Sequence, residues 1–214
     1  MKPKTAAELH QNIPPDWYER GIKENIFQRF WHYRRFKNVG ELTKPTGGKI
    51  LDIGCADGTF TKVILDYSKA DLVVGIDVLP PSVAYAKKKF ARSKKLRFRV
   101  AQAEDLPFDN NEFDAVFALE VLEHVFKPEK VLAEIKRVLK KGGYVVFLVP
   151  SENLLFRIIW FFWVRSRGKI WKGTHIQKFD QIKLEKLIKK SGLIIVARKF
   201  FLLGMIKAVK AQKK

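Results

Sequence analysis

The segment from Lys49 to Thr61, KILDIGCADGTFT, constrains the fold of this chain more than any other stretch. Its apolar first half predicts a buried strand, which runs into a turn containing Gly54 and Gly58, and a helical pattern follows at once. Glycine lets a ligand approach the backbone closely, and the N–H groups of such a turn face outward from a helix N-terminus. The segment therefore predicts a nucleotide-like ligand, unless it is an ordinary tight connection between a strand and a helix.

The turn departs from the dinucleotide-binding pattern, whose spacing here gives Gly54, Ala56 and Thr59. Asp52 and Asp57 would also place two negative charges close to the phosphates of a dinucleotide. A cationic ligand would be favoured instead. The pattern resembles motif I of the class I S-adenosylmethionine-dependent methyltransferases, whose cofactor carries a sulfonium and an ammonium group in place of phosphates.

Two later segments strengthen the resemblance. Asp77 ends the apolar run 72–76 and lies about 20 residues after the turn, where such folds hold a ribose by its hydroxyls. Residues 101–125, AQAEDLPFDNNEFDAVFALEVLEHV, closely resemble the motifs of the UbiE and methyltransferase-11 group. That resemblance implies that Gln102, Ala103 and Glu104 lie along the adenine. Gln102 departs from the usual acid or Asn, but its carbonyl can still accept a hydrogen bond from the adenine amino group.

These motifs imply S-adenosyl-L-methionine as the cofactor. The predicted cofactor-binding residues are Asp52, Gly54, Cys55, Ala56, Asp57, Gly58, Asp77, Val78, Gln102, Ala103, Glu104, Leu119 and Glu120. Cys55 fits better as a small turn residue than as a nucleophile, because no histidine lies near it in the sequence. No metal site is predicted. His124 and His175 are the candidate general bases, because imidazole titrates near neutrality, and a structural or orienting role is the alternative for both.

The order of elements predicts a doubly wound α/β fold of the Rossmann-like class I methyltransferase type. Five parallel strands are predicted, with the third over 96–100 and the fourth over 113–119. A helix over 128–140 and a stop at Gly142-Gly143 should precede the fifth strand over 144–149. A helix near 180–191 and strands near 193–199 and 206–211 should follow. The few residues between these last two strands cannot form a parallel crossover, so the seventh strand should be antiparallel. We expect one domain over residues 1–214. Its predicted parts are an N-terminal helical cap (1–47), a cofactor-binding core (48–150), a lid-like insert (151–175) and a C-terminal helix with a β-hairpin (176–214).

The N-terminal cap and the insert should cover the methyl-donor pocket. An amphipathic helix capped by Asp16 is predicted from Trp17 to Tyr33. Its aromatic side is expected to pack against the sheet, and a substrate-facing role, which can coexist with that packing, is the alternative. The insert 151–175 holds six aromatic residues and five bases against one acid. Three interpretations compete for it: an interfacial helix on an anionic membrane, an RNA-binding surface, or a lid that packs on the N-terminal helix.

The formal net charge of +20 at pH 7 is unevenly distributed. Many lysines and arginines fall between helix ends and strand starts, whereas the acids of the motifs fall at strand ends, on the ligand edge of such a sheet. The longest uncharged apolar run, 158–164, is far shorter than the roughly 20 residues of a bilayer span. The N-terminus lacks the apolar run of a signal peptide, and Cys55 is the single cysteine. We therefore expect a cytoplasmic protein without a transmembrane segment.

The sequence thus predicts direct in-line methyl transfer to a small or amphipathic acceptor, with a lipid-like or prenylated molecule as one candidate. An RNA methyltransferase, or a non-catalytic protein that binds S-adenosylmethionine or RNA, is the alternative. The Asn-Pro-Pro-Tyr-type motif of amino methyltransferases is replaced by Leu119-Glu120-Val121, which argues against exocyclic amines of bases as acceptors.

Overall fold

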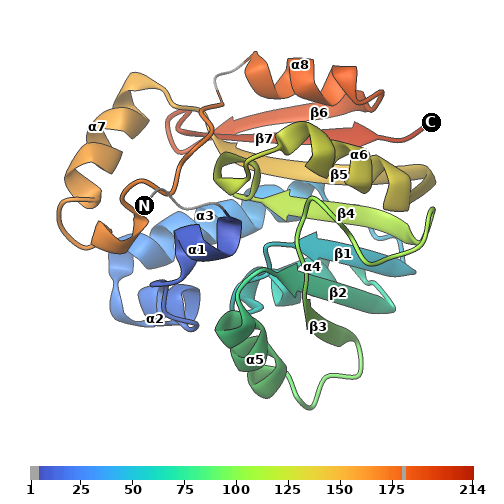
Figure 1. Cartoon of the computed structure of the whole chain (residues 1–214), viewed down its shortest axis with the longest axis horizontal. Helices are drawn as coiled ribbons and strands as arrows, with labels where there is room; N and C mark the ends of the chain where they lie inside the picture. Colours follow the sequence, from blue (N-terminus) through green and yellow to red (C-terminus); the bar gives the residue numbers. More distant parts are fainter. Residues whose placement is uncertain (1–4, 180–181) are drawn as a thin grey trace.

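The computed structural model describes residues 5–179 and 182–214, which form a seven-stranded sheet with helices on both faces (Figure 1). The strand order is β3-β2-β1-β4-β5-β7-β6, and β7 pairs antiparallel with both of its neighbours. The predicted doubly wound sheet with an antiparallel last strand is confirmed. The strands are β1 (Lys49–Ile53), β2 (Leu72–Asp77), β3 (Leu96–Val100), β4 (Phe113–Leu119), β5 (Leu139–Pro150), β6 (Ile194–Phe201) and β7 (Ile206–Gln212).

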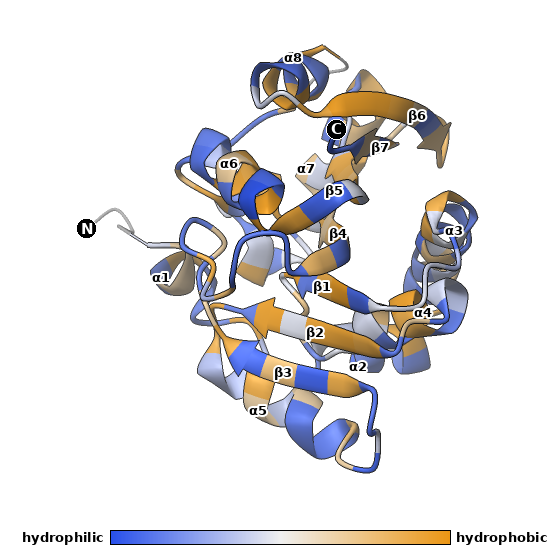
Figure 2. Cartoon of the chain, turned by 90° about the vertical axis from the view of Figure 1, so that its right-hand side faces the viewer, coloured by the Kyte–Doolittle hydropathy of each residue, from blue (hydrophilic) through white to orange (hydrophobic). Residues whose placement is uncertain are grey.

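Helices cover the sheet in two layers, each with its own apolar core. On one face α6 and α8 pack on the sheet, and on the other face α3, α4 and α5 do so. Figure 2 shows the covering helices α6 and α8 with hydrophilic and hydrophobic residues on the same helix, as expected for helices with one buried side. The helices are α1 (Ala6–His10), α2 (Trp17–Glu24), α3 (Ile26–Leu42), α4 (Thr59–Ser68), α5 (Pro80–Lys89), η1 (Leu122–His124), α6 (Pro128–Val138), α7 (Leu154–Trp163), η2 (Lys169–Trp171) and α8 (Lys183–Lys190).

The central strands are buried on both sides, which explains their continuous apolar sequences. In β4 every residue except Asp114 is buried, and β1 is buried from Ile50 onward. Such strands pair in parallel, with β1 between β2 and β4. Parallel pairing brings the carboxyl ends of these strands to one edge of the sheet, and α1, α2 and α7 lie beyond that edge (Figure 1).

The prediction of one N-terminal helix from Trp17 to Tyr33 is wrong in three respects. The chain breaks at Asn25, whose backbone is extended and whose side chain caps α3 by accepting hydrogen bonds from two N–H groups. The Asp16 side chain makes no cap hydrogen bond to α2. Of the predicted aromatic side, Ile26, Phe30 and Tyr33 do not reach the core, because they are 72%, 59% and 64% exposed.

Two smaller boundaries also differ from the prediction. We expected Gly142 and Gly143 to separate a helix from the fifth strand, but α6 ends at Val138 and β5 already begins at Leu139. The glycines lie inside β5, where the register with β4 shifts. The helix expected near 180–191 is α8, which begins at Lys183, and positions 180–181 lie outside the described residues.

A search of the described helices for one with the length and hydropathy of a membrane span finds none.

The turn after β1 requires glycine at position 58 for two physical reasons. Gly58 has a φ of +77°, and an added Cβ would lie 2.8 Å from the Phe90 ring and 2.9 Å from the Phe98 ring. Gly142 offers a matched control, because its φ is +76° but an added Cβ would meet nothing within 4 Å.

We predict that Gly58→Ala lowers the free energy of unfolding by about 1–3 kcal/mol more than Gly142→Ala does, because only the first adds overpacking to the backbone strain that both share. Urea denaturation of the two variants measures this difference. Equal losses for the two variants would contradict the steric role assigned to Gly58.

Candidate functional site

Two adjoining cavities lie at the carboxyl ends of the parallel strands. The glycine-turn cavity, of about 110 Å³, is bounded by the turn after β1, the end of β2, and α1 and α2. The tryptophan cavity, of about 260 Å³, is bounded by α2, α3, α7 and η1. The five residues that line both cavities are Trp17, Tyr18, Glu120, His124 and Trp171. The cavities therefore meet where β4 ends.

Seven of the predicted cofactor residues line the glycine-turn cavity: Gly54, Ala56, Asp77, Val78, Ala103, Glu104 and Glu120. The other six lie outside that lining: Asp52, Cys55, Asp57, Gly58, Gln102 and Leu119. Gly54 has a φ of +75°, and a Cβ there would lie 2.6 Å from the Val121 side chain. A larger residue would therefore push the turn away from the loop that follows β4. The cofactor roles remain predictions for all thirteen positions.

Asp77 joins the end of β2 to the glycine turn. Its Oδ2 accepts a hydrogen bond from the Ala56 N–H at 3.0 Å, and its Oδ1 accepts one from the Leu79 N–H at 2.9 Å. Burial raises the pKa of Asp77, and its backbone hydrogen bonds counteract part of that shift. The carboxylate lines the glycine-turn cavity, where each oxygen keeps a lone pair for hydroxyl groups of a ligand.

Three predicted cofactor residues have structural surroundings instead of a place in the cavity lining: Asp52, Asp57 and Cys55. Asp52 is buried, accepts the Thr61 hydroxyl at 2.6 Å, and has a pKa raised to about 7 by burial. Asp57 accepts the N–H of Glu19 at 2.8 Å, which ties α2 to the turn. Burial also raises the pKa of the Cys55 thiol, so that it stays protonated and unreactive.

Gln102 and Leu119 differ from the expectation in position. Gln102 is exposed and forms an isolated bridge with Asp105, whereas Leu119 is buried in the core on the α3 side of the sheet. The adenine contact expected of Gln102 therefore has no counterpart among the cavity residues, while the neighbouring Ala103 and Glu104 do line the cavity.

A buried arginine is the main site residue that the sequence did not reveal. Arg35 of α3 is 2% exposed, forms an ion pair with Glu120, and donates to the His32 ring at 3.0 Å. Glu120 has a φ of +57°, an uncommon backbone conformation for a non-glycine residue that often marks functional sites. Arg35 is one of four arginine and lysine residues in α3, and nothing in the sequence separates it from the other three until the helix is oriented.

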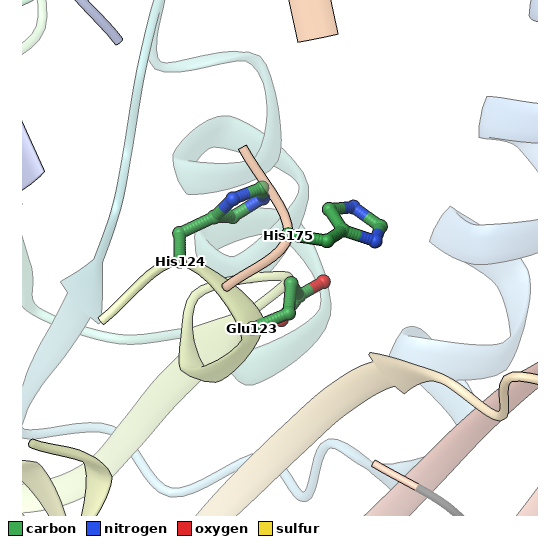
Figure 3. A group of neighbouring side chains, drawn as sticks. All are labelled: Glu123, His124 and His175. Atoms are coloured by element: carbon green, nitrogen blue, oxygen red, sulfur yellow. The ribbon is translucent and has the colours of Figure 1, made fainter. Parts of the chain in front are cut away.

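Glu123, His124 and His175 converge beside this pair (Figure 3). The first two belong to η1, and His175 comes from the segment 174–177, whose backbone N–H groups at 176 and 177 donate to the Glu123 carbonyl. Their ligand atoms lie within 4.8 Å of one another. Three ligands of one metal ion can have such a spacing, but spacing alone does not assign a metal, and the expectation of no metal stays a prediction.

The two histidines in this group differ in their surroundings. The His124 Nδ1 lies 2.9 Å from the Thr174 carbonyl, so it donates that hydrogen bond and leaves Nε2 as an acceptor. Burial lowers the pKa of His124 well below its usual value. The His175 ring stacks on Trp160 at 4.2 Å between centroids, and its Nδ1 lies 3.6 Å from Glu152. His124 lines both cavities, whereas His175 lines only the tryptophan cavity.

All five tryptophans of the chain line the tryptophan cavity: Trp17, Trp31, Trp160, Trp163 and Trp171. They come from the N-terminal cap and the insert, the two segments expected to cover the methyl-donor pocket. Trp17 of the cap contacts Trp171 of the insert at 6.1 Å between ring centroids. The aromatic residues of the insert therefore build a cavity with the N-terminal helices as well as packing on them.

Comparisons with known proteins identify the family of the chain. A family model for a methyltransferase domain matches residues 51–147. The chain is 30% identical over 182 residues to a ubiquinone biosynthesis O-methyltransferase of Pelagibacter ubique, with 84% of this chain and 69% of that protein covered. It is 34% identical over 161 residues to the mitochondrial ubiquinone biosynthesis O-methyltransferase of Rattus norvegicus, with 71% of this chain and 46% of that protein covered.

Among solved structures, the (4+2)-cyclase SpnF has a TM-score of 0.77 at 19% identity, with 98% of this chain and 96% of that chain covered. At that identity the likeness concerns the fold alone. The chain belongs to the class I S-adenosylmethionine-dependent methyltransferases, as the motifs predicted. It spans about half the length of the rat relative (46%), so its own activity and substrates are treated below as a proposal.

The packing of His32 against Arg35 predicts a specific pH dependence. Burial, followed by the Arg35 charge, lowers the pKa of His32 from 6.5 to about 2. Below pH 6.5 the unfolded chain therefore binds a proton that folded His32 does not bind, so the penalty on stability grows as the pH falls. Asp52, whose pKa is raised, shifts stability in the opposite direction over this range.

A comparison with His32→Asn isolates the histidine, because Asn can still accept the hydrogen bond from Arg35. The stability advantage of the natural protein over this variant should fall by about 2 kcal/mol between pH 7 and pH 5, at 1.36 kcal/mol per pH unit below 6.5. Denaturant titrations at both pH values measure it. A difference that does not change with pH would contradict a neutral, buried His32.

Proposed function

We propose that this protein transfers the methyl group of S-adenosylmethionine directly to a small or amphipathic acceptor. The observation that carries the proposal is the junction of the two cavities at Glu120, His124 and Trp171. One cavity is bounded by the motifs that the family uses for its cofactor, and the other is an aromatic chamber. A methyl group at the junction would face the second cavity from the first.

The chemistry requires positioning more than it requires reactive groups. The acceptor atom forms a bond to the methyl carbon while the bond from that carbon to sulfur breaks, and sulfur leaves with the electron pair as a neutral thioether. This needs the acceptor about 3 Å from the methyl, in line with sulfur and away from water. The rings of the tryptophan cavity would exclude water, and the cap residues Trp17 and Tyr18 cover both cavities.

Individual residues take distinct roles in this proposal. Asp77 would hold the ribose hydroxyls, and Ala103 and Glu104 would lie along the adenine. Glu120 stands at the junction, where its carboxylate would face the cationic end of the cofactor, and Arg35 forms an ion pair with that carboxylate. His124 is better placed than His175 to accept a proton or hydrogen bond from the acceptor, because it reaches both cavities with a neutral ring.

An amphipathic acceptor fits the outer surface around the tryptophan cavity. Phe27 of α3 and Phe162 of α7 are 81% and 66% exposed, and the first turn of α3 forms a shallow hollow with Trp163 and Arg167. Arg29 is exposed on α3, and Arg165 is exposed in the turn that follows α7. Apolar rings beside arginines suit the acyl boundary and the headgroups of an anionic membrane. We propose this surface as the contact through which a lipid-like acceptor enters.

The alternatives receive less support. The ubiquinone relatives are O-methyltransferases of small molecules by name, whereas no contact in the described chain singles out nucleic acid. A non-catalytic binding protein would have the same fold. Calorimetric titration with S-adenosylmethionine, followed by radiolabelled methyl transfer into lipid, small-molecule and RNA fractions, separates these functions. Cofactor binding without transfer into any fraction would favour the non-catalytic protein.

For the cofactor site, we predict that Asp77→Ala weakens S-adenosylmethionine binding at least tenfold, because hydrogen bonds to a charged acceptor contribute roughly 1.5–3 kcal/mol each. Asp66→Ala serves as the control, since Asp66 is exposed on α4 and pairs with Lys62 away from both cavities. Isothermal titration calorimetry of both variants tests this. Equal affinities of the natural protein and Asp77→Ala for S-adenosylmethionine would contradict the proposal that Asp77 binds the ribose.

For the membrane contact, we predict that the protein co-sediments with vesicles containing phosphatidylglycerol and less with pure phosphatidylcholine. The double variant Phe27→Ser/Phe162→Ser should lose at least tenfold in binding, since burying each ring contributes roughly 1.5–3 kcal/mol. Val196→Ser is the matched control, because Val196 is 50% exposed on the edge strand β6. Binding that is unchanged in the double variant would contradict the proposed surface.

A further inference from the structure

The tryptophan cavity collects all the buried side-chain polar atoms that lack hydrogen-bond partners in the described part of the chain. These atoms are Gln28 Oε1, Arg35 Nε, both carboxyl oxygens of Glu123, and Trp171 Nε1. All four residues line the tryptophan cavity. Buried polar atoms are otherwise almost always paired, so their concentration in one cavity indicates a ligand with polar groups of its own.

Glu123 is the most exceptional member of this group. Glu123 is only 2% exposed, and Figure 3 shows its side chain turned toward His175. The backbone carbonyl of Glu123 is well bonded, but neither carboxyl oxygen has a partner. Burial raises the pKa of Glu123 well above its usual value, so the ionised form of this carboxyl group needs a neighbouring cation to stabilise it.

The charges around the cavity leave Glu123 uncompensated. Its lining contains two carboxylates, Glu120 and Glu123, and one permanent cation, Arg35. Arg35 already pairs with Glu120. Burial lowers the pKa values of His32 and His124, so these rings are neutral near pH 7 and supply no cation. The remaining histidine of the lining, His175, has its Nδ1 3.6 Å from a different carboxylate, that of Glu152. A chain with a formal charge of +20 thus keeps one unpaired carboxyl group inside an aromatic chamber.

The aromatic walls of the cavity also favour a cation. The faces of indole rings carry negative electrostatic potential and attract cations, with tryptophan the strongest of the aromatic residues. Trp160 stacks on Phe156 at 5.6 Å and meets Trp163 at 5.1 Å between centroids, so these rings form a continuous wall. The opposite side of the cavity is formed by Trp17 and Trp31 of the N-terminal helices.

We propose that the tryptophan cavity binds an acceptor whose head is an organic ammonium group, held between the indole faces and the Glu123 carboxylate. This inference rests on the proposed function only in calling the ligand an acceptor. The unpartnered N–H groups of Arg35 and Trp171 remain for an oxygen elsewhere on the ligand. The apolar body would extend toward the exposed rings of α3 and α7.

A pair of isosteric probes tests the charge requirement directly. Phenyltrimethylammonium and tert-butylbenzene have nearly the same shape, and only the first is charged. Because every tryptophan of the chain lines this cavity, intrinsic fluorescence reports binding without a label. We expect phenyltrimethylammonium to bind at least ten times more tightly than tert-butylbenzene. Equal binding, or tighter binding of the neutral probe, would overturn the proposal.

Variants locate the source of the preference. Glu123→Gln preserves shape and should reduce the preference for the charged probe at least fivefold. Glu152→Gln is the matched control, since Glu152 lies 3.6 Å from His175 but outside the cavity lining, and it should leave the preference unchanged. Trp160→Leu provides a second, independent test and should weaken the charged probe more than the neutral one. An unchanged preference in both Glu123→Gln and Trp160→Leu would overturn the proposal.

Two controls separate this inference from its competitors. Binding of phenyltrimethylammonium should be insensitive to EDTA and to added Zn²⁺. Loss with EDTA, or displacement by Zn²⁺, would show that Glu123 serves a metal and would overturn the proposal. Calorimetry with S-adenosylmethionine on the same samples tests the proposed function separately. A protein that binds the charged probe but not S-adenosylmethionine would refute that function while leaving the ammonium site intact.

Discussion

The ion pair between Arg35 and Glu120 is the contact on which the site depends. Glu120 follows β4 directly with a positive φ, and Arg35 reaches it from α3, 85 residues earlier in the chain. Arg35 is buried and Glu120 is partly buried, so removal of Glu120 would leave the Arg35 charge buried without its partner, which is strongly destabilising. The ion pair fixes the N-terminal helices over the strand ends, so that the two cavities meet at Glu120.

The strands and the turn of this fold could be predicted from sequence because their signals are local. Buried parallel strands give continuous apolar runs, and β3 and β4 have the residue bounds that the sequence predicted. Gly54 and Gly58 are required by backbone conformation, which a sequence records directly. Asp77 could be placed because its spacing from the turn follows from the length of one helix and one strand. The antiparallel last strand followed from a connection too short for a crossover.

The rest could not be predicted because it depends on how distant segments meet. An aromatic helix face looks the same in sequence whether it faces a core, a cavity or solvent, and α3 does all three with Phe36, Trp31 and Phe30. The helix breaks at Asn25 because its side chain caps α3, and sequence alone does not show whether such a cap forms or the preceding helix continues. Trp17 and Trp171 lie together only after the insert folds back on the cap. The burial of Arg35 and Glu123 likewise appears only once the layers are assembled.

The central claim is that the glycine-turn cavity presents the reactive sulfur to the tryptophan cavity. A crystal structure with S-adenosylhomocysteine tests it most directly. We expect to find the ribose at Asp77. The sulfur should lie among the residues that line both cavities, beside Glu120 and His124, and face the tryptophans. A sulfur that points away from the tryptophan cavity, or a ligand bound in a different part of the protein, would contradict this arrangement of the two cavities.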